Sequence, residues 1–295
     1  MAVNKYSITY FGGLKMKMEF PVEQTVKNRH SVRTYSDKPI SPETRAKLEA
    51  YIDTLYNPFS ASVKFSMLES EAAVNSAKLG TYGMIQGAKE YFGATVGKND
   101  FALEGLGYEF EKLILFAASL DLGTCWLGGT FNRSEFAIAM DVSGNDLFPA
   151  ISPIGYPAGK KRLKESLMRK VIKADQRKPW EDLFFNRTFS TPLSRQDAGE
   201  YSFPLEMMIL APSASNKQPW RIVKNENSYH FFETSSPGYG ERLGFDIQKV
   251  DLGIAACHFH MAVMEKDLKG EFKFFMAPEI DMPDHTKYLF SWVAE

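Results

Sequence analysis

The sequence predicts an α+β fold in which helices cover a mainly antiparallel sheet, and it predicts that this arrangement occurs twice. Helical and strand-like patterns alternate along the chain, and two long apolar helices each follow an aromatic-rich strand candidate. Segments of the first half also recur in the second half. With 295 residues, the chain is long enough for one large domain or two ordinary ones.

Local patterns predict each element in turn. Residues 21–29, PVEQTVKNR, read as a helix with Pro21 in its first turn. A second helix begins in ISPETRAKLEAYIDTL, where Ser41 is the N-cap and Pro42 takes the first helical position. The strand candidates are residues 14–20, 63–68, 91–96, 150–156, 221–223 and 229–234.

The internal duplication is predicted from matches that keep the same order in both halves. LGYEFEKLIL at 106–115 resembles LGFDIQKVDL at 243–252, which gives an offset of 244 − 107 = 137 between Gly107 and Gly244. Both segments are expected to open long helices. Asn28-Arg29 likewise resembles Asn186-Arg187. We expect a first repeat at 1–183 and a shortened second repeat at 184–295.

Composition excludes several classes of protein. The formal net charge of −1 gives no strong field for nucleic acid or an anionic membrane surface. Two cysteines, Cys125 and Cys257, indicate buried thiols in a reducing compartment. The apolar stretch LILFAA is far shorter than the roughly 20 residues that span a bilayer. A cytoplasmic protein is expected.

The two repeats have kept different pieces. NRHSVRTYSDKPIS in the first is shortened to NRTFSTPLS in the second, whereas APSASNKQPWRIV in the second corresponds to only NPFSASVKF in the first. If the repeats pack as the subunits of a dimer would, one complete site survives at their interface.

The first retained piece suits a phosphate. Arg29, Ser31 and Arg33 alternate, so in an extended segment they point to one side, and guanidinium groups bind anions with charge-assisted hydrogen bonds. The alternative is two solvated surface arginines. The second piece clusters Ser213, Asn216, Gln218 and Trp220, although a turn alone would explain Pro212 and Ser213.

Together these pieces resemble the flavin-dependent nitroreductase family, with its R-[RH]-S-x-[RK] phosphate motif and P-S-x-x-N-x-Q-P-W loop. LDLGTCWLGG at 120–129, FPAISPIGYP at 148–157 and RKPWEDLFF at 177–185 extend the likeness over most of the chain. Family members usually carry both motifs in each chain. The division here resembles the fused, pseudo-dimeric branch, whose fold is a nitroreductase-like three-layer sandwich with one site per chain.

The resemblance implies an FMN site built from both repeats and no catalytic side chain. The phosphate and ribityl end would be held by Arg29, His30, Ser31, Arg33 and Arg177. The flavin N5 edge would face Leu127, Gly128 and Gly129, and the pyrimidine edge would contact Thr81. The ring would be lined from the opposite repeat by Pro212, Ser213, Ala214, Ser215 and Asn216.

The activity implied is NAD(P)H-dependent, two-electron reduction of a nitroaromatic or a quinone by a ping-pong mechanism. The protein would act as a monomeric pseudo-dimer, with further association open. A non-catalytic flavin sensor or storage protein is the alternative, and a relic without cofactor is a third interpretation.

Two other patterns are set aside. GYGERLG at 238–244 imitates a dinucleotide fingerprint, but Leu243 stands where the third glycine belongs. His258 and His260 lie two residues apart, which on a helix places them on different faces, so no metal site is expected.

Overall fold

The protein is described by a computed structural model that covers residues 8–11, 14–17, 19–69, 80–159, 176–239, 243–274 and 277–295. The chain forms two compact units. Unit 1 comprises residues 1–27, 176–213 and 217–295, and unit 2 comprises residues 28–175 together with Ala214–Asn216. The units therefore interleave along the chain. The predicted boundary at 183/184 divides the two sequence repeats, which are a different division from these units, and it stays a prediction.

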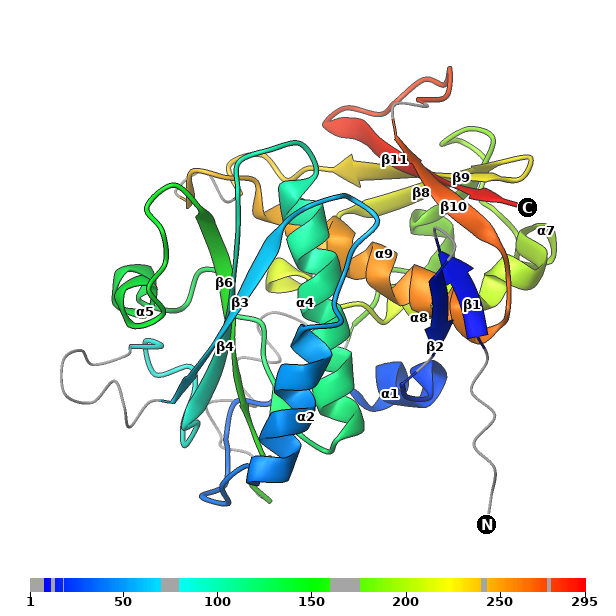
Figure 1. The fold of residues 1–295 in the computed structure, drawn as a ribbon. Helices are drawn as coiled ribbons and strands as arrows, with labels where there is room; N and C mark the ends of the chain where they lie inside the picture. Colours follow the sequence, from blue (N-terminus) through cyan, green and yellow to red (C-terminus); the bar gives the residue numbers. More distant parts are fainter. Residues whose placement is uncertain are drawn as a thin grey trace, which may run out of the picture. The chain divides into compact units, whose positions relative to one another are not determined.

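Unit 2 is a four-stranded antiparallel sheet in the order β3-β4-β6-β5, with the long helix α4 packed against it and α2 packed on α4 (Figure 1). Its helices and strands are α2 (Pro42–Ile52), β3 (Val63–Glu69), β4 (Glu90–Val96), α4 (Ala102–Ser119), β5 (Gly123–Thr124), α5 (Arg133–Ala139) and β6 (Leu147–Gly155). The short helix η3 (Ala214–Asn216) also belongs to this unit.

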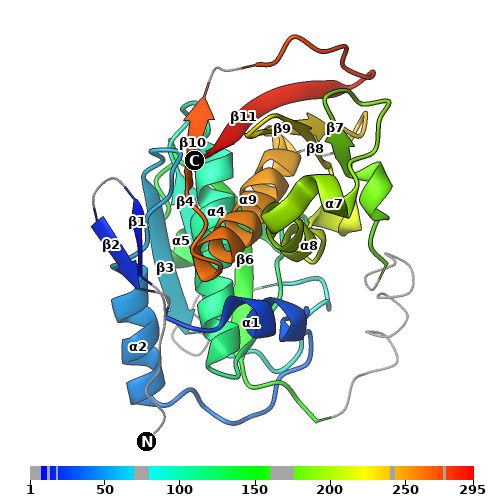
Figure 2. The ribbon, with the colours of Figure 1, turned by 90° about the vertical axis from the view of Figure 1, so that its right-hand side faces the viewer.

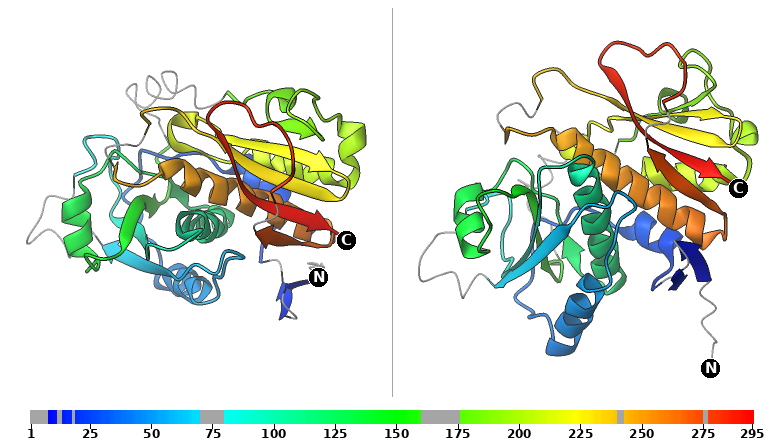
Figure 3. Two further views of the ribbon diagram at one scale, coloured as in Figure 1. Left: turned by 90° about the horizontal axis from the view of Figure 1, so that it is seen from above. Right: turned by 45° about the horizontal axis from the view of Figure 1, so that its top comes forward.

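Unit 1 contains a five-stranded sheet in the order β10-β11-β9-β8-β7, in which only the β7–β8 pair is parallel. The long helix α9 packs against β8 and β9 on one side and α8 on the other (Figures 2 and 3). Its elements are β1 (Ile8–Phe11), β2 (Leu14–Lys17), α1 (Val22–Asn28), η1 (Trp180–Asp182), β7 (Phe184–Asn186), α7 (Arg195–Ala198), η2 (Gly199–Tyr201), α8 (Ser202–Ile209), β8 (Trp220–Asn225), β9 (Ser228–Thr234), α9 (Ile247–Glu265), β10 (Gly270–Phe274) and β11 (Thr286–Ala294).

The two units share one topology, which confirms the predicted duplication. Each runs strand, strand, long helix, strand, strand, and the sheet order β3-β4-β6-β5 corresponds to β8-β9-β11-β10. In each unit a shorter helix, α2 or α8, packs on the long one. The predicted mainly antiparallel α+β architecture is therefore correct.

The predicted alignment of the long helices is wrong. The offset between β4 and β9 is 228 − 90 = 138, close to the sequence match, but that between α4 and α9 is 247 − 102 = 145. The loop before α9 has 12 residues, 235–246, against five, 97–101, before α4. Gly107 consequently lies inside α4, whereas Gly244 precedes α9 with a φ of 73°.

The two predicted helix starts have different causes. Ser41 Oγ accepts a hydrogen bond from the Thr44 N–H at 3.1 Å, which caps α2 ahead of Pro42. At α1 the partner is distant in sequence. Glu265 accepts hydrogen bonds from the N–H groups of Val22 and Glu23 at 2.7 and 2.9 Å, so the last residue of α9 caps the first helix of the same unit.

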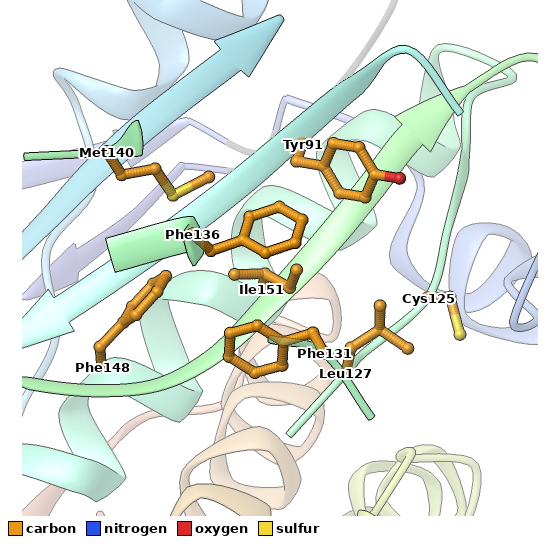
Figure 4. Packing of buried hydrophobic residues seen from close by; sticks show 8 residues of the cluster. All are labelled: Tyr91, Cys125, Leu127, Phe131, Phe136, Met140, Phe148 and Ile151. Atoms are coloured by element: carbon orange, nitrogen blue, oxygen red, sulfur yellow. The ribbon is translucent and has the colours of Figure 1, made fainter. Parts of the chain in front are cut away.

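An aromatic cluster of unit 2 packs between β4, β6 and α5 (Figure 4). The Phe136 ring lies edge-on to Tyr91 and Phe131, at centroid distances of 5.1 and 5.6 Å. Leu127 and Phe131 belong to the cluster. It therefore supports both sides of the 127–131 loop.

Candidate functional site

The predicted phosphate-binding segment, residues 29–33, is extended and lies beside β5. Ser31 bridges Thr124 in parallel, and the Val32 N–H donates to the Thr124 carbonyl at 2.8 Å. On the other side the Gln86 N–H donates to the Arg33 carbonyl at 2.9 Å. The approach requires glycine at 123, because a Cβ there would lie 2.7 Å from a Val32 methyl group. Tertiary contacts thus fix this segment from two sides.

Both predicted arginines are buried, which overturns the alternative of solvated surface groups. The Arg29 side chain is 6% exposed, and its Nε lies 3.9 Å from Glu111 Oε1. Arg33 is 8% exposed. Its Nε and Nη1 are buried, and neither has a hydrogen-bond partner among the residues that the structure describes. A buried cation with unbonded donors is costly on its own and is suited to an anionic ligand.

Glu111 is an acidic counterpart that sequence patterns did not indicate. It is fully buried in α4 and accepts a hydrogen bond from Trp126 Nε1 at 2.7 Å, besides its ion pair with Arg29. One carboxylate is therefore both the counter-charge of Arg29 and the hydrogen-bond acceptor of Trp126, the residue just before Leu127. No motif distinguishes Glu111 from the other glutamates of this helix.

The predicted glycine loop follows directly. Leu127 is buried and forms an antiparallel bridge with Ile151, whereas Gly128 is half-buried and Gly129 is exposed. Thr81 is buried in a turn whose preceding residue, Gly80, accepts a hydrogen bond from the Asn132 N–H at 2.8 Å. Unit 2 therefore connects the arginine segment to the glycine loop through β5, and Thr81 to the far end of that loop.

The remaining residues of the predicted site fall as follows. His30 is exposed, with its Nδ1 3.1 Å from the Asn28 carbonyl oxygen. Ala214, Ser215 and Asn216 belong to unit 2, although they come from the second repeat in sequence. Arg177, Pro212 and Ser213 belong to unit 1.

The 213–218 loop has an unusual backbone. Ser215, Asn216 and Gln218 have φ values of 50°, 56° and 48°, a region that residues other than glycine rarely adopt. The Gln218 N–H donates to Ser213 Oγ at 2.9 Å, and its buried side chain accepts from the Lys178 N–H at 2.8 Å. Gln218 thus has a structural role, and it explains why glutamine stands in this motif.

A group of cations surrounds Gln218 in unit 1. Arg221 Nη1 donates to the Gln218 carbonyl at 3.0 Å, and Lys217 is its chain neighbour. Burial, followed by the positive charge of Arg221, lowers the pKa of Lys178 to about 8. Arg177 Nη2 donates to the Leu210 carbonyl at 3.4 Å, a long and weak bond. Lys178, Arg221 and Lys217 thus lie close enough to interact, with Asp182 as a nearby opposite charge.

Other candidates prove to be structural. His258 is fully buried and its Nδ1 lies 3.1 Å from the Met207 carbonyl oxygen, while the His260 ring packs edge-on against Phe272 at 5.3 Å. Cys125 and Cys257 are both buried and free, as predicted. Residues 240–242 of GYGERLG lie outside the described residues, as does Met18 of the 14–20 strand candidate.

Across the described ranges, no three histidines, cysteines or carboxylates gather closely enough to hold a metal ion. Within the same ranges, no helix combines the length and the apolar character that crossing a bilayer requires.

Comparisons with known proteins agree with the geometry. A family model described as "Putative TM nitroreductase" matches residues 21–263. The chain is similar in fold to a putative nitroreductase of Thermotoga maritima MSB8, with a TM-score of 0.60 and 17% identity over 97% of this chain and 99% of that one.

Two shorter structures match about half of the chain. A nitroreductase family protein of Clostridium novyi NT gives a TM-score of 0.40 and 20% identity over 50% of this chain and 91% of that one. A putative nitroreductase in complex with FMN from Desulfovibrio desulfuricans gives a TM-score of 0.36 and 22% identity over 50% of this chain and 96% of that one. No curated protein matches the sequence.

Proposed function

The chain belongs to the "Putative TM nitroreductase" family and is a flavin oxidoreductase, and from that premise we propose that it binds one FMN and uses NAD(P)H to reduce a nitroaromatic or a quinone. When bound, FMN supplies a two-electron carrier that passes reducing equivalents from NAD(P)H to the acceptor in a ping-pong cycle. The protein would act in the cytoplasm as a monomer whose two repeats, 1–183 and 184–295, replace the subunits of a dimer.

The buried guanidinium of Arg33 is the observation that carries the proposal. Its Nε and Nη1 find no acceptor among the described residues, whereas a phosphate would accept from both. Arg29 Nε is also buried without a hydrogen-bond partner among the described residues, and its nearest acidic group is Glu111 at 3.9 Å. Ser31 lies between the two arginines in sequence. These residues fit the phosphate end of FMN.

The other residues of the proposed site would supply shape and direction. The exposed Gly129 and half-buried Gly128 allow close approach to a flat ring, since neither has a side chain. Pro212, Ser213 and the strained Ser215 and Asn216 would line the ring from the second repeat, and Arg177 would add a contact to the phosphate. Thr81 would contact the pyrimidine edge and His30 the phosphate region. No side chain is assigned a proton-transfer role.

The experiment is a spectral titration of the purified protein. We expect a yellow protein that NADH or NADPH bleaches under nitrogen and that a quinone restores. Bound flavin that never bleaches would favour a sensor or storage protein. A protein that stays colourless after incubation with FMN would contradict the proposal.

Variants then test the site. Arg29→Ala combined with Arg33→Ala should abolish FMN retention, and Asn216→Ala should weaken it from the other repeat. Arg45→Ala is the matched control, because Arg45 lies in the same unit but pairs with Glu69 and Glu90. FMN retention by the double variant equal to that of the control would refute the phosphate assignment.

A further inference from the structure

The loop from Leu127 to Asn132 in unit 2 is held at both ends. The Leu127 N–H donates to the Ile151 carbonyl at 2.9 Å, and the Ile151 N–H donates back at 3.1 Å. At the other end the Asn132 N–H donates to Gly80, and the Phe131 ring is buried in the aromatic cluster beside Phe136 (Figure 4). Between these points lie Gly128, Gly129 and Thr130, which contribute no side chain to that cluster.

Arg133 fixes the middle of this loop. It is the first residue of α5, and its guanidinium lies 4.8 Å above the Phe131 ring. Nη2 donates to the Gly128 carbonyl at 2.6 Å and to the Pro149 carbonyl at 3.1 Å, while Nε donates to the Phe148 carbonyl at 2.9 Å. One side chain thus connects the glycine loop to Phe148 and Pro149, near the start of β6.

The bond to Gly128 also sets the direction of the next N–H. In a trans peptide the C=O and N–H groups point in opposite directions, so the Gly129 N–H must point away from Arg133. Neither the Gly128 nor the Gly129 N–H has an acceptor among the residues that the structure describes. Gly129 is exposed, and a Cβ placed on it would meet nothing within 4 Å. The exposed Gly129 therefore carries a backbone donor without an acceptor among the described residues, next to a site where a side chain would meet no atom.

An arginine is a costly way to hold one carbonyl. Burial disfavours its charged form and lowers the pKa of Arg133, and three carbonyls are needed to offset that cost. A neutral amide at this position could satisfy two carbonyls without bringing a positive charge. Arginine therefore places a positive charge beside the glycine loop, which a neutral amide would not do.

We propose that Arg133 is a positioning residue that directs the Gly129 N–H group at the N5 edge of the flavin and, with its own charge, favours the reduced ring. This inference rests on the proposed function, since it requires bound FMN. Reduction adds negative charge to the ring, so preorganised donors and a nearby cation stabilise the reduced state more than the oxidised state.

The test compares the affinities of Arg133→Gln and Arg133→Lys for oxidised and reduced FMN. Glutamine should raise the Kd for reduced FMN tenfold more than the Kd for oxidised FMN, which for a two-electron couple lowers the midpoint potential by about 30 mV. Lysine keeps the positive charge but lacks the several fixed N–H donors of the guanidinium group. Arg133→Lys should therefore lower the midpoint potential by less than Arg133→Gln does. Arg195→Gln is the control, because Arg195 is exposed, pairs with Glu206 at 3.0 Å, and should leave the potential unchanged.

The measurements are flavin fluorescence quenching for the oxidised form and an anaerobic titration against reference dyes for the potential. Circular dichroism of each apo variant verifies its fold. If Arg133→Gln does not fold, the comparison of the two redox forms is made with Arg133→Lys. Equal loss of affinity for both redox forms, with the wild-type potential retained, would mean a structural role only and overturn the inference while leaving the proposed function intact. Wild-type protein that takes up no FMN would overturn both.

Discussion

Replacing Arg33 with methionine should stabilise the flavin-free protein while weakening FMN binding. Methionine matches much of the length of arginine but carries no donors, so the buried Nε and Nη1 that lack acceptors among the described residues disappear. An unsatisfied buried donor costs about 1–3 kcal/mol, and a charged one costs more. We therefore expect the apo free energy of unfolding of Arg33→Met to exceed that of wild type by about 1–3 kcal/mol.

The same change should have the opposite sign in the holoprotein. A hydrogen bond to a charged group contributes about 1.5–3 kcal/mol, so losing even one raises the Kd for FMN roughly tenfold to a hundredfold. Saturating FMN should then add less to the unfolding free energy of Arg33→Met than to that of wild type, because stabilisation by a ligand grows with the logarithm of its concentration over Kd.

Urea titrations with and without FMN, combined with fluorescence titration of FMN, measure both effects. Arg45→Met is the control, because Arg45 Nη2 lies 2.9 Å from Glu90 Oε2 and its loss leaves a buried carboxylate uncompensated. This control should be destabilised and should bind FMN normally. The reasoning fails if Arg33→Met behaves like Arg45→Met in both measurements.

Three further changes test the structure. Burial raises the pKa of Glu109 from 4.5 to about 7, so the folded state holds this proton more tightly, and the contribution to stability is lost as pH rises from about 4.5 to 7. Glu109→Gln should remove up to about 3 kcal/mol of that pH dependence in urea melts; a pH profile identical to wild type would refute it. Gln218→Leu deprives the Lys178 N–H of its acceptor and should cost about 1–3 kcal/mol, together with faster proteolysis of the 213–218 loop. Phe136→Ala, in the fully buried cluster, should cost about 3–5 kcal/mol by thermal melt, whereas Ile138→Ala, on the same helix and 79% exposed, should change stability by less than about 0.5 kcal/mol.

Repetition in the sequence was enough to predict the duplication but not its alignment. The strands β4 and β9 keep an offset of 138, whereas the helices that follow are offset by 145 because the second loop is seven residues longer. A short match around Gly107 and Gly244 conceals such an insertion. The bounds of the strands and helices reveal it, and the sheet order is unchanged because strand pairing tolerates any loop length that closes.

For the motif residues too, the sequence identified the positions, whereas the structure was needed to show what some of them do. Arg29, Ser31 and Arg33 could be selected from their spacing and Asn216 from its polar cluster, and the family resemblance added the glycine loop. Gln218 belongs to the same motif, but its bond to the Lys178 N–H shows that it holds the loop. Motifs record which residues occur together, and both ligand contact and loop anchoring can produce that pattern.

The sequence by itself determined the elements whose causes are local: Ser41 and Pro42 start α2, and aromatic-rich segments form β4 and β9. Only the tertiary structure decided that Arg33 Nε and Nη1 are buried without an acceptor among the described residues, that Glu111 pairs with Arg29, and that Arg133 holds Gly128. The physical reason is distance along the chain. Caps and strand patterns act within a few residues, whereas burial of a charge depends on segments that folding brings together from elsewhere in the sequence.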